Sequence, residues 1–243
     1  MALTSTYSTF PQSKGLMRAL LDFILPHLCP GCQTCVHTPG FCPQCWMKLH
    51  FITPPYCDLC GNPGVLGLRD LCHSCRLQTP LFNRHRALWE YGTVSRRIIF
   101  GLKHGRQRYL ANLLAPWIVP IILQHPVDCL IPVPLHQNRL AGRGFNQAAI
   151  LATEIGRLTG IPVKLQGLTR PLKAPSQGRF SAQQRRENVM GAFESRRSWD
   201  GQSVLLIDDV FTTGSTLNAC TYALREAGAH HIHAVTLAKV LHR

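Results

Sequence analysis

Acidic residues are scarce in this sequence. Its 243 residues include 12 Asp and Glu against 26 Lys and Arg, which gives a formal net charge of +14 at pH 7. Residues 1–80 hold only 5 of the basic and 3 of the acidic residues, so most of the excess lies in residues 81–243. A basic surplus of this size favours a polyanionic partner, such as nucleic acid, a phosphorylated substrate or an acidic membrane surface.

Long hydrophobic runs are also missing. The longest apolar stretch, residues 113–123, is interrupted by Pro116 and Pro120, and it is shorter than the roughly 18 residues that suggest a membrane span. The apolar patch at residues 19–28 is broken by Asp22 and Pro26, and no small-residue cleavage site follows it. We therefore expect no membrane span, no secretory signal and a cytosolic protein.

Cysteine, in contrast, is abundant and regularly spaced. Eight of the 11 cysteines form four CxxC pairs, separated by 9, 11 and 11 residues. A CxxC turn directs two thiolates at one centre, and two such turns complete a tetrahedral zinc site. The pattern therefore predicts two structural zinc ions, whereas a redox CxxC normally occurs once. The predicted ligands are Cys29, Cys32, Cys42 and Cys45 for one ion, and Cys57, Cys60, Cys72 and Cys75 for the other.

The spacing leaves some alternatives open. An interleaved pairing of the four turns is compatible with it, and Cys35, three residues after Cys32, is an alternative ligand. Cys129 and Cys220 are most simply buried apolar residues. A module this small has little core, so its folding would depend on metal. Because four sulfur ligands leave no open position for water, we expect no catalysis there.

Beyond the cysteine pairs, apolar strand patterns alternate with helix patterns. This alternation predicts an α/β fold with a mainly parallel sheet that helices cover on both faces. We expect an N-terminal extension (1–28), a Cys-rich double zinc ribbon (29–80) and an α/β domain (81–243). The expected strands are 85–91, 129–134, 204–207 and 232–238; the expected helices are 94–103, 108–124, 146–158 and 215–227, with Gly160 and Gly228 as stops; loops are expected at 141–146 and 170–188.

The most informative segment is residues 204–216, VLLIDDVFTTGST. It joins an apolar strand, the carboxylates of Asp208 and Asp209, a Thr/Gly/Ser turn and a helix start. Ligands of open α/β sheets bind at the carboxyl ends of strands, and such a turn before a helix suits a phosphate. The carboxylates would repel that phosphate unless they bind sugar hydroxyls or help to hold a metal.

One ligand satisfies all these features: a ribose with a 5′-phosphate and a metal-bound pyrophosphate. The alternative is a structural one, in which the segment is only a buried strand with two solvated acids, and Thr213 or Ser215 caps the helix. A strand followed by an aspartate would be weak evidence for such a ligand, but the complete run 204–216 is much more specific. It closely resembles the 5-phosphoribosyl-1-pyrophosphate (PRPP) motif of type I phosphoribosyltransferases.

The order of the other motifs narrows the family. The four CxxC pairs are followed by LKHGR (102–106), IPVPL (131–135), RGFNQ (143–147), Gln177, Arg185 and NVMGAF (188–193). This order resembles the ComF family, which includes GntX-like proteins. The resemblance covers about residues 29–240. It implies a type I phosphoribosyltransferase-like parallel sheet flanked by helices in residues 81–243, preceded by the double zinc ribbon.

The resemblance also implies roles for the matching residues. The two carboxylates would bind ribose hydroxyls, the turn 212–216 would hold the 5′-phosphate, and the loop 132–134 would lie on the pyrophosphate side with Mg²⁺. Residues 173–188 would form a flap. Phe211 departs from the usual pattern of the phosphate run, and a large aromatic residue is tolerable there if it packs beneath the turn. The residues predicted to bind PRPP are Asp208, Asp209, Thr212, Thr213, Gly214, Ser215, Thr216, Pro132, Val133, Pro134, Lys103 and Arg143.

Several basic residues have two interpretations. Lys103 and Arg106 form either a pyrophosphate contact or a solvated helix end. Arg143 stands between glycines that allow the backbone to approach a ligand or DNA. No catalytic residue can be assigned, because no general base is evident near the motif. The residues predicted to contact nucleic acid are Arg106, Arg139, Arg143, Phe145, Arg179, Arg185 and Arg186.

Two functions follow as expectations. The resemblance implies a cytosolic protein of DNA uptake in natural transformation, which binds a PRPP-like ligand and single-stranded DNA. Its expected partners are the helicase or the channel components of DNA uptake. The alternative is an active phosphoribosyltransferase that transfers the phosphoribosyl group of PRPP to an unidentified acceptor. In that reaction, Mg²⁺ and the phosphate loops would stabilise the departing pyrophosphate.

Overall fold

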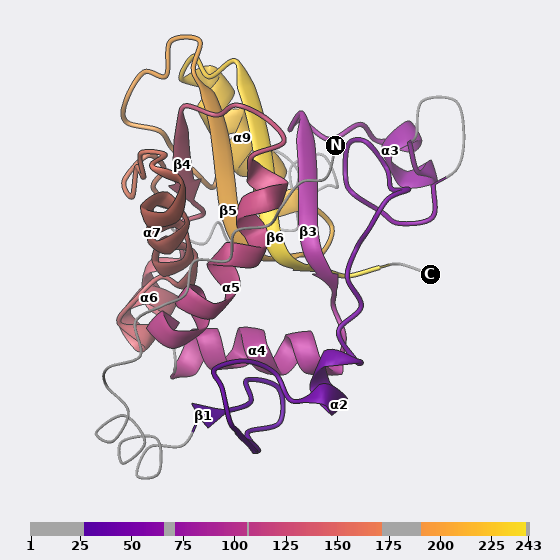
Figure 1. Cartoon of the computed structure of the whole chain (residues 1–243). Coiled ribbons are helices and arrows are strands. Elements are labelled where there is room, and N and C mark those ends of the chain that lie inside the picture. Colours follow the sequence, from indigo (N-terminus) through magenta and orange to yellow (C-terminus); the bar gives the residue numbers. More distant parts are fainter. Residues whose placement is uncertain (1–26, 66–70, 106, 172–190, 242–243) are drawn as a thin grey trace, which may run out of the picture.

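A four-stranded parallel sheet forms the centre of the protein (Figure 1). The computed structural model describes residues 27–65, 71–105, 107–171 and 191–241. The strand order is β3-β6-β5-β4, and all three pairings are parallel. The predicted α/β fold with a parallel sheet is confirmed. The strands are β3 (Arg84–Glu90), β4 (Cys129–Pro132), β5 (Ser203–Phe211) and β6 (His231–Lys239).

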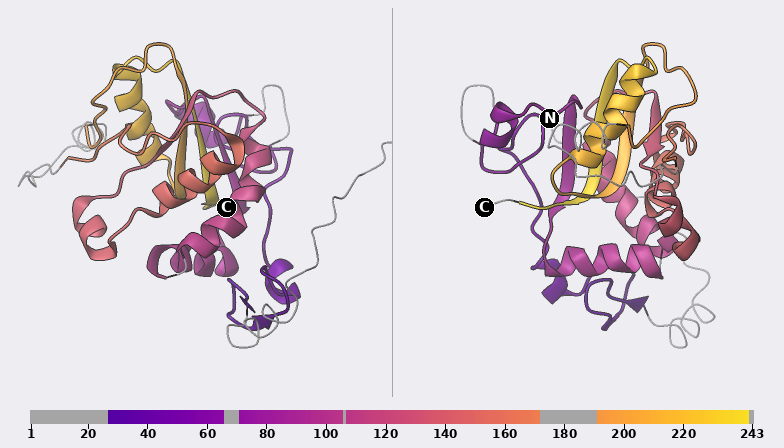
Figure 2. Two further views of the ribbon diagram at one scale, coloured as in Figure 1. Left: turned by 60° about the vertical axis from the view of Figure 1, so that its left-hand side comes forward. Right: turned by 180° about the vertical axis from the view of Figure 1, so that it is seen from behind.

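Helices cover both faces of this sheet, as predicted. Helices α5 and α7 pack against each other on one face, and α9 lies on the other (Figures 1 and 2). Helix α4 runs past the ends of the strands, and its Lys103 reaches Asp209 of β5. No helix in the described part of the chain is long and apolar enough to cross a membrane. The helices are α4 (Thr93–His104), α5 (Gln107–Ile122), α6 (Gln137–Arg143), α7 (Gln147–Thr159) and α9 (Ser215–Glu226).

Helix α5 continues through Pro116 and Pro120, as the expected helix 108–124 does, because both prolines lie on its exposed side, where the missing backbone hydrogen bonds are least costly. Two other elements differ from the expected ones. Helix α6 covers part of the expected loop and ends at Gly144, whose φ of 75° is left-handed. Strand β5 continues past both acids to Phe211, since Phe211 still pairs with Lys239 of β6.

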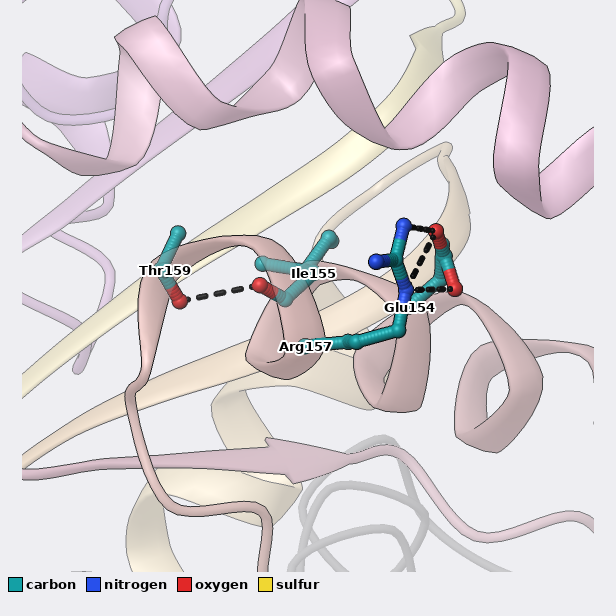
Figure 3. A network of polar contacts seen from close by, with 4 residues as sticks. All are labelled: Glu154, Ile155, Arg157 and Thr159. Atoms are coloured by element: carbon teal, nitrogen blue, oxygen red, sulfur yellow. Dashed lines mark hydrogen bonds and ion pairs between the residues drawn. The ribbon is translucent and has the colours of Figure 1, made fainter.

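Helix α7 shows how an amphipathic pattern is anchored at its ends. Its sheet side buries Leu151 and Ile155. On the other side, Arg157 Nε donates to both carboxylate oxygens of Glu154 at 3.0 Å (Figure 3). The Thr159 hydroxyl donates to the carbonyl of Ile155 at 2.9 Å, and Gly160, with a φ of 74°, ends the helix as predicted. The exposed ion pair adds little to stability, so burial positions this helix.

The cysteine-rich segment contributes to both cores of the sheet. It contains β1 (His27–Leu28), β2 (Cys35–Val36), α2 (Pro43–Trp46) and α3 (His73–Leu77). The cysteines of its first half are buried with residues of α4, α5 and α7, whereas those of its second half are buried with residues of β5 and α9. The segment therefore does not rely on a small core of its own. Cys129 and Cys220 are buried apolar residues, as predicted.

Candidate functional site

The eight CxxC cysteines form two separate clusters. Within each cluster the four sulfur atoms lie within 4.8 Å of one another. The Sγ atoms of Cys32 and Cys42 are 3.5 Å apart, and those of Cys60 and Cys72 are 3.6 Å apart. A tetrahedral zinc ion with Zn–S bonds of about 2.3 Å requires S–S distances of about 3.8 Å. The two sites fit two structural zinc ions. The pairing is consecutive, and Cys35 lies outside both clusters.

Backbone donors support the first cluster. The N–H of Cys42 donates to Cys29 Sγ at 3.3 Å, and the N–H of Cys45 donates to Cys42 Sγ at 3.4 Å. Such contacts favour the thiolate form that binds a metal. A hydrogen bond from the Thr34 hydroxyl lowers the pKa of Cys32 to about 6. These contacts preorganise the cysteines as zinc ligands.

Cations of the sheet support the second cluster. Arg86 of β3 donates from Nη1 to the carbonyls of Cys57 at 3.3 Å and Asp58 at 3.0 Å. Lys239 of β6 is only 4% exposed. Burial lowers the pKa of Lys239, while the cysteines of this cluster, Cys60 foremost, raise it. A zinc ion with four thiolates carries two negative charges, so these buried cations offset the charge of the centre.

The two predicted acids lie at the carboxyl end of β5 with a lysine beside them. The N–H of Asp209 donates to the carboxylate of Asp208 at 2.8 Å. Lys103, in the last turn of α4, forms an ion pair with the carboxylate of Asp209. Burial, and then the charge of Asp209, raise the pKa of Asp208 well above its usual value. The structure thus brings together three of the predicted PRPP-binding side chains.

The turn after β5 presents its hydroxyl groups to solvent. The side chains of Thr212, Thr213, Ser215 and Thr216 are exposed. The hydroxyls of Thr213 and Ser215 lie 2.8 Å apart and share a hydrogen bond. Gly214, with a φ of 80°, precedes the first residue of α9 and has no side chain to cap it, while the N–H of Ser215 donates to the Thr213 hydroxyl at 3.4 Å. Uncapped N–H groups at a helix start, together with these hydroxyls, suit a phosphate.

Phe211 packs beneath this turn, which is the condition under which an aromatic residue is tolerable there. It is buried, and a Cβ atom added at Gly214 would lie 2.9 Å from its ring. The ring of His85 stacks on Phe211 with centroids 4.2 Å apart, and Lys239 Nζ lies 3.8 Å from the Phe211 centroid. Sequence reasoning did not identify His85 or Lys239. Both residues stand near the end of a strand that contains other polar residues, so neither stood out in the sequence.

The loop after β4 lies beside the acids and is fastened by Asn146. The N–H of Val133 donates to the carbonyl of Ile207 on β5 at 2.9 Å. Asn146 Nδ2 donates to the carbonyl of Val133 at 2.9 Å, while Asn146 Oδ1 accepts from the N–H of Ala148 at 3.0 Å. Asn146 therefore caps α7 and holds the 132–134 loop, a role that the sequence had left unassigned.

The predicted nucleic-acid residues are only partly described. Arg139 is exposed on α6, and Phe145 is half-buried just after that helix. Arg143 Nη1 donates to the buried side chain of Gln147 at 3.2 Å, so part of its guanidinium is engaged within the protein. The other predicted contacts lie outside the described residues: Arg106, Arg179, Arg185 and Arg186, as does the expected flap 173–188.

Comparison with known proteins agrees with this arrangement. Residues 20–76 match the family model of the double zinc ribbon domain, and residues 140–243 match that of the phosphoribosyl transferase domain. Competence protein F of Haemophilus influenzae is 30% identical over 223 residues, which cover 87% of this chain and 90% of that protein.

Two further relatives cover most of the chain. The DNA utilization protein YhgH of Escherichia coli O157:H7 is 29% identical, over 76% of this chain and 84% of its own length. Competence protein ComFC of Bacillus subtilis is 26% identical, over 77% of this chain and 78% of its own length. The similarity therefore extends across both the cysteine clusters and the sheet.

Proposed function

Because the chain belongs to the ComF family, we propose that it acts in DNA uptake during natural transformation, where it binds a PRPP-like ligand and single-stranded DNA in the cytosol. The names of its relatives, which are competence and DNA utilization proteins, support the assignment to DNA uptake. The proposal assigns residues 29–80 to the zinc ribbon and 81–243 to the phosphoribosyltransferase-like domain, after an extension at 1–28.

The observation that carries the ligand assignment is the exposed turn 212–216 directly after the acid pair. Its hydroxyls and the start of α9 would hold the 5′-phosphate, while Asp208 and Asp209 would accept hydrogen bonds from the ribose hydroxyls. The 132–134 loop would lie along the pyrophosphate, with Arg143 close by. The acids, the turn and the 132–134 loop come from the carboxyl ends of strands, where ligands of such sheets bind, whereas Arg143 comes from α6.

In this proposal Lys103 would exchange its partner when the ligand binds. Its ammonium pairs with Asp209. Ribose hydroxyls that bind Asp209 would compete for the same carboxylate, and the freed ammonium would turn to the pyrophosphate. Hard carboxylate oxygens fit Mg²⁺, and the ion would neutralise pyrophosphate charge when it is bound.

Calorimetry on the full-length, zinc-loaded protein tests the proposal. The ligands are PRPP with Mg²⁺, an oligothymidylate, and both together. In the double variant Asp208→Asn/Asp209→Asn, loss of charge-assisted hydrogen bonds should weaken PRPP binding at least about tenfold. Glu194→Gln/Glu226→Gln removes the same charge from exposed positions and should change PRPP affinity less than about twofold.

Two results would count against the proposal. Unchanged PRPP affinity in the Asp208→Asn/Asp209→Asn variant would refute the site. Absence of oligothymidylate binding by the unaltered protein would refute the DNA-binding part. Release of pyrophosphate from PRPP in the presence of an acceptor would instead favour the alternative function, an active phosphoribosyltransferase.

A further inference from the structure

A groove of about 1050 Å³ runs along the junction between the first zinc cluster and α4. Its walls are residues 30–33 of the first CxxC turn on one side and α4 along its length on the other, and Figure 1 shows β1 and α2 of the ribbon beneath that helix. We propose that this groove binds single-stranded DNA. The proposal rests on the DNA-binding function proposed above and gives it a surface other than the predicted arginines of α6 and residues 179–186.

The zinc ribbon is seated firmly against α4, so both walls of the groove are fixed. A Cβ atom at Gly31 would lie 2.7 Å from Cys45 Sγ and 3.0 Å from a methyl group of Val94 on α4. The contact therefore requires glycine at this position. Arg97 Nη1 also donates to the carbonyl of Gly31 at 3.5 Å across the junction. A rigid groove needs little ordering when it binds a ligand.

Aromatic rings are exposed along the groove. Phe100 is 64% exposed, which is unusual for a phenylalanine in a helix that buries Ile98 and Leu102. Its ring lies 4.5 Å from the ring of His104, one turn further along α4. Tyr91, just before the helix, is 38% exposed. Exposed flat rings in a groove are the surfaces on which unpaired bases stack.

The charge of the groove complements phosphate. None of the described residues that line the groove is acidic, whereas two of them, Arg96 and Arg97, are basic. The two arginines lie near the start of α4, where the helix dipole disfavours a positive charge, and no acidic residue occurs in the first turn. Helix stability therefore does not explain them. A polyanion bound in the groove would make favourable contacts with both.

The spacing along α4 keeps this face distinct from the buried face. Arg96, Phe100 and His104 fall on one side of the helix, while Ile98 and Leu102 fall on the other. Alternation of cations with rings favours a single strand, because a duplex hides its base faces. A basic groove without rings would bind either form through phosphates alone.

The test is fluorescence anisotropy of the full-length, zinc-loaded protein with a labelled oligothymidylate of about 16 nucleotides. Arg96→Ser/Arg97→Ser should weaken binding at least tenfold and reduce the slope of log affinity against log salt by about 1.4. Phe100→Ala should weaken binding at least fivefold through lost stacking and leave that slope unchanged. A matched duplex should bind without dependence on Phe100.

A control variant isolates the groove from general charge. Arg196→Ser/Arg225→Ser removes two exposed arginines outside the groove and should change affinity less than about twofold, because only contacted phosphates enter the salt slope. All variants should keep two zinc ions and bind PRPP as the unaltered protein does. That result would separate the groove from the phosphoribosyl site.

Three outcomes would overturn the inference. Full affinity for the oligothymidylate in both groove variants would place DNA elsewhere while leaving the proposed function intact. Equal losses in the groove variants and in the control would show that only net charge matters. Binding of polyglutamate that depends on Phe100, with no such dependence for the oligothymidylate, would identify the groove as a docking site for an acidic protein.

Discussion

Gly214 is the residue on which the shape of the phosphate turn most directly depends. Its φ of 80° lies in the left-handed region, and a Cβ atom there would press into the ring of Phe211. Phe211 cannot move easily, because His85 stacks on its other side. The ring of Phe211 therefore packs directly under the turn, and its position leaves space only for glycine at position 214.

We predict that Gly214→Ala abolishes most PRPP binding, with a loss of at least about tenfold, and destabilises the protein by about 2 kcal/mol through left-handed strain and the clash. Gly201→Ala is the matched control. Gly201 has a φ of 75°, but nothing lies within 4 Å of its Cβ position. It should lose about 1 kcal/mol of stability and retain PRPP affinity. Equal PRPP binding by both variants, measured by calorimetry, would contradict the role of Phe211.

Asp208, unlike Gly214, is a residue at which PRPP binding and stability make opposite demands. Burial and the neighbouring Asp209 carboxylate raise its pKa. The folded state therefore holds the Asp208 proton more tightly than the unfolded state does. The stability that this proton confers is present at low pH, and it is lost as pH rises from the unfolded pKa, about 3.9, through the raised folded pKa.

Asp208→Asn should consequently be more stable than the unaltered protein at pH 7, although it binds PRPP more weakly. The gain should shrink as pH falls toward about 4 and disappear below it, because the aspartate then becomes protonated in the unfolded state as well as in the folded state. Urea midpoints across this pH range measure the difference. Glu226→Gln, at an exposed position, should show no such trend. A lower urea midpoint for Asp208→Asn at pH 7 would contradict this account.

At the scale of elements, the second zinc cluster is bound to strands β3 and β6. His85 of β3 donates from Nδ1 to the carbonyl of Cys60 at 3.0 Å, and its Nε2 lies 3.0 Å from the hydroxyl of Thr236 on β6. Burial lowers the pKa of His85 to about 3, so the ring is neutral at pH 7 and can both donate and accept. The same ring stacks on Phe211, which connects the zinc cluster to the phosphate turn.

Lys239→Met should weaken zinc retention in the second cluster only. The substitution keeps the length of the side chain but removes a buried positive charge that offsets the zinc–thiolate centre. Loss of such outer contacts typically costs about tenfold or more in metal affinity. Zinc release to a chelator, followed with alkylation mapping, should show Cys57–Cys75 exposed first. Lys164→Met serves as the control, and identical release from both variants would exclude the charge argument.

At the scale of the whole molecule, the two zinc clusters stabilise opposite sides of the sheet. Phe41, next to Cys42 of the first cluster, has its ring 6.2 Å from Trp89 and 5.8 Å from Trp117. Cysteines of the second cluster are buried in the same core as Trp199. Metal at these positions therefore supports the packing of the sheet as well as the fold of the ribbon.

Removal of both zinc ions should lower the melting temperature of the entire chain by more than about 10 °C. Tryptophan fluorescence should report the change, because Trp89 and Trp199 are fully buried, one in each core. Re-addition of zinc should restore the original spectrum. If the chelated protein kept its tryptophan spectrum and melting temperature, the clusters would be independent of the sheet.

Much of the fold and of the site could be predicted because the signals are contiguous. Two cysteines in a CxxC turn, or an acid pair followed by Thr-Thr-Gly-Ser-Thr, have their geometry set by a few neighbouring residues. The pairing of the CxxC turns, which their spacing left open, is decided by the tertiary structure. The turns themselves, the order of helices and strands and the exposed turn 212–216 depend on such short-range geometry. Local chemistry was therefore sufficient for them.

The remaining features depend on contacts between distant parts of the chain. His85 and Thr236 are 151 positions apart, and Lys103 of α4 meets Asp209 of β5. The partition of the cysteines between two cores and the groove beside α4 likewise depend on which faces of the sheet and helices meet. Packing of the complete core selects those faces, because apolar burial is non-directional and no short sequence pattern specifies its partner.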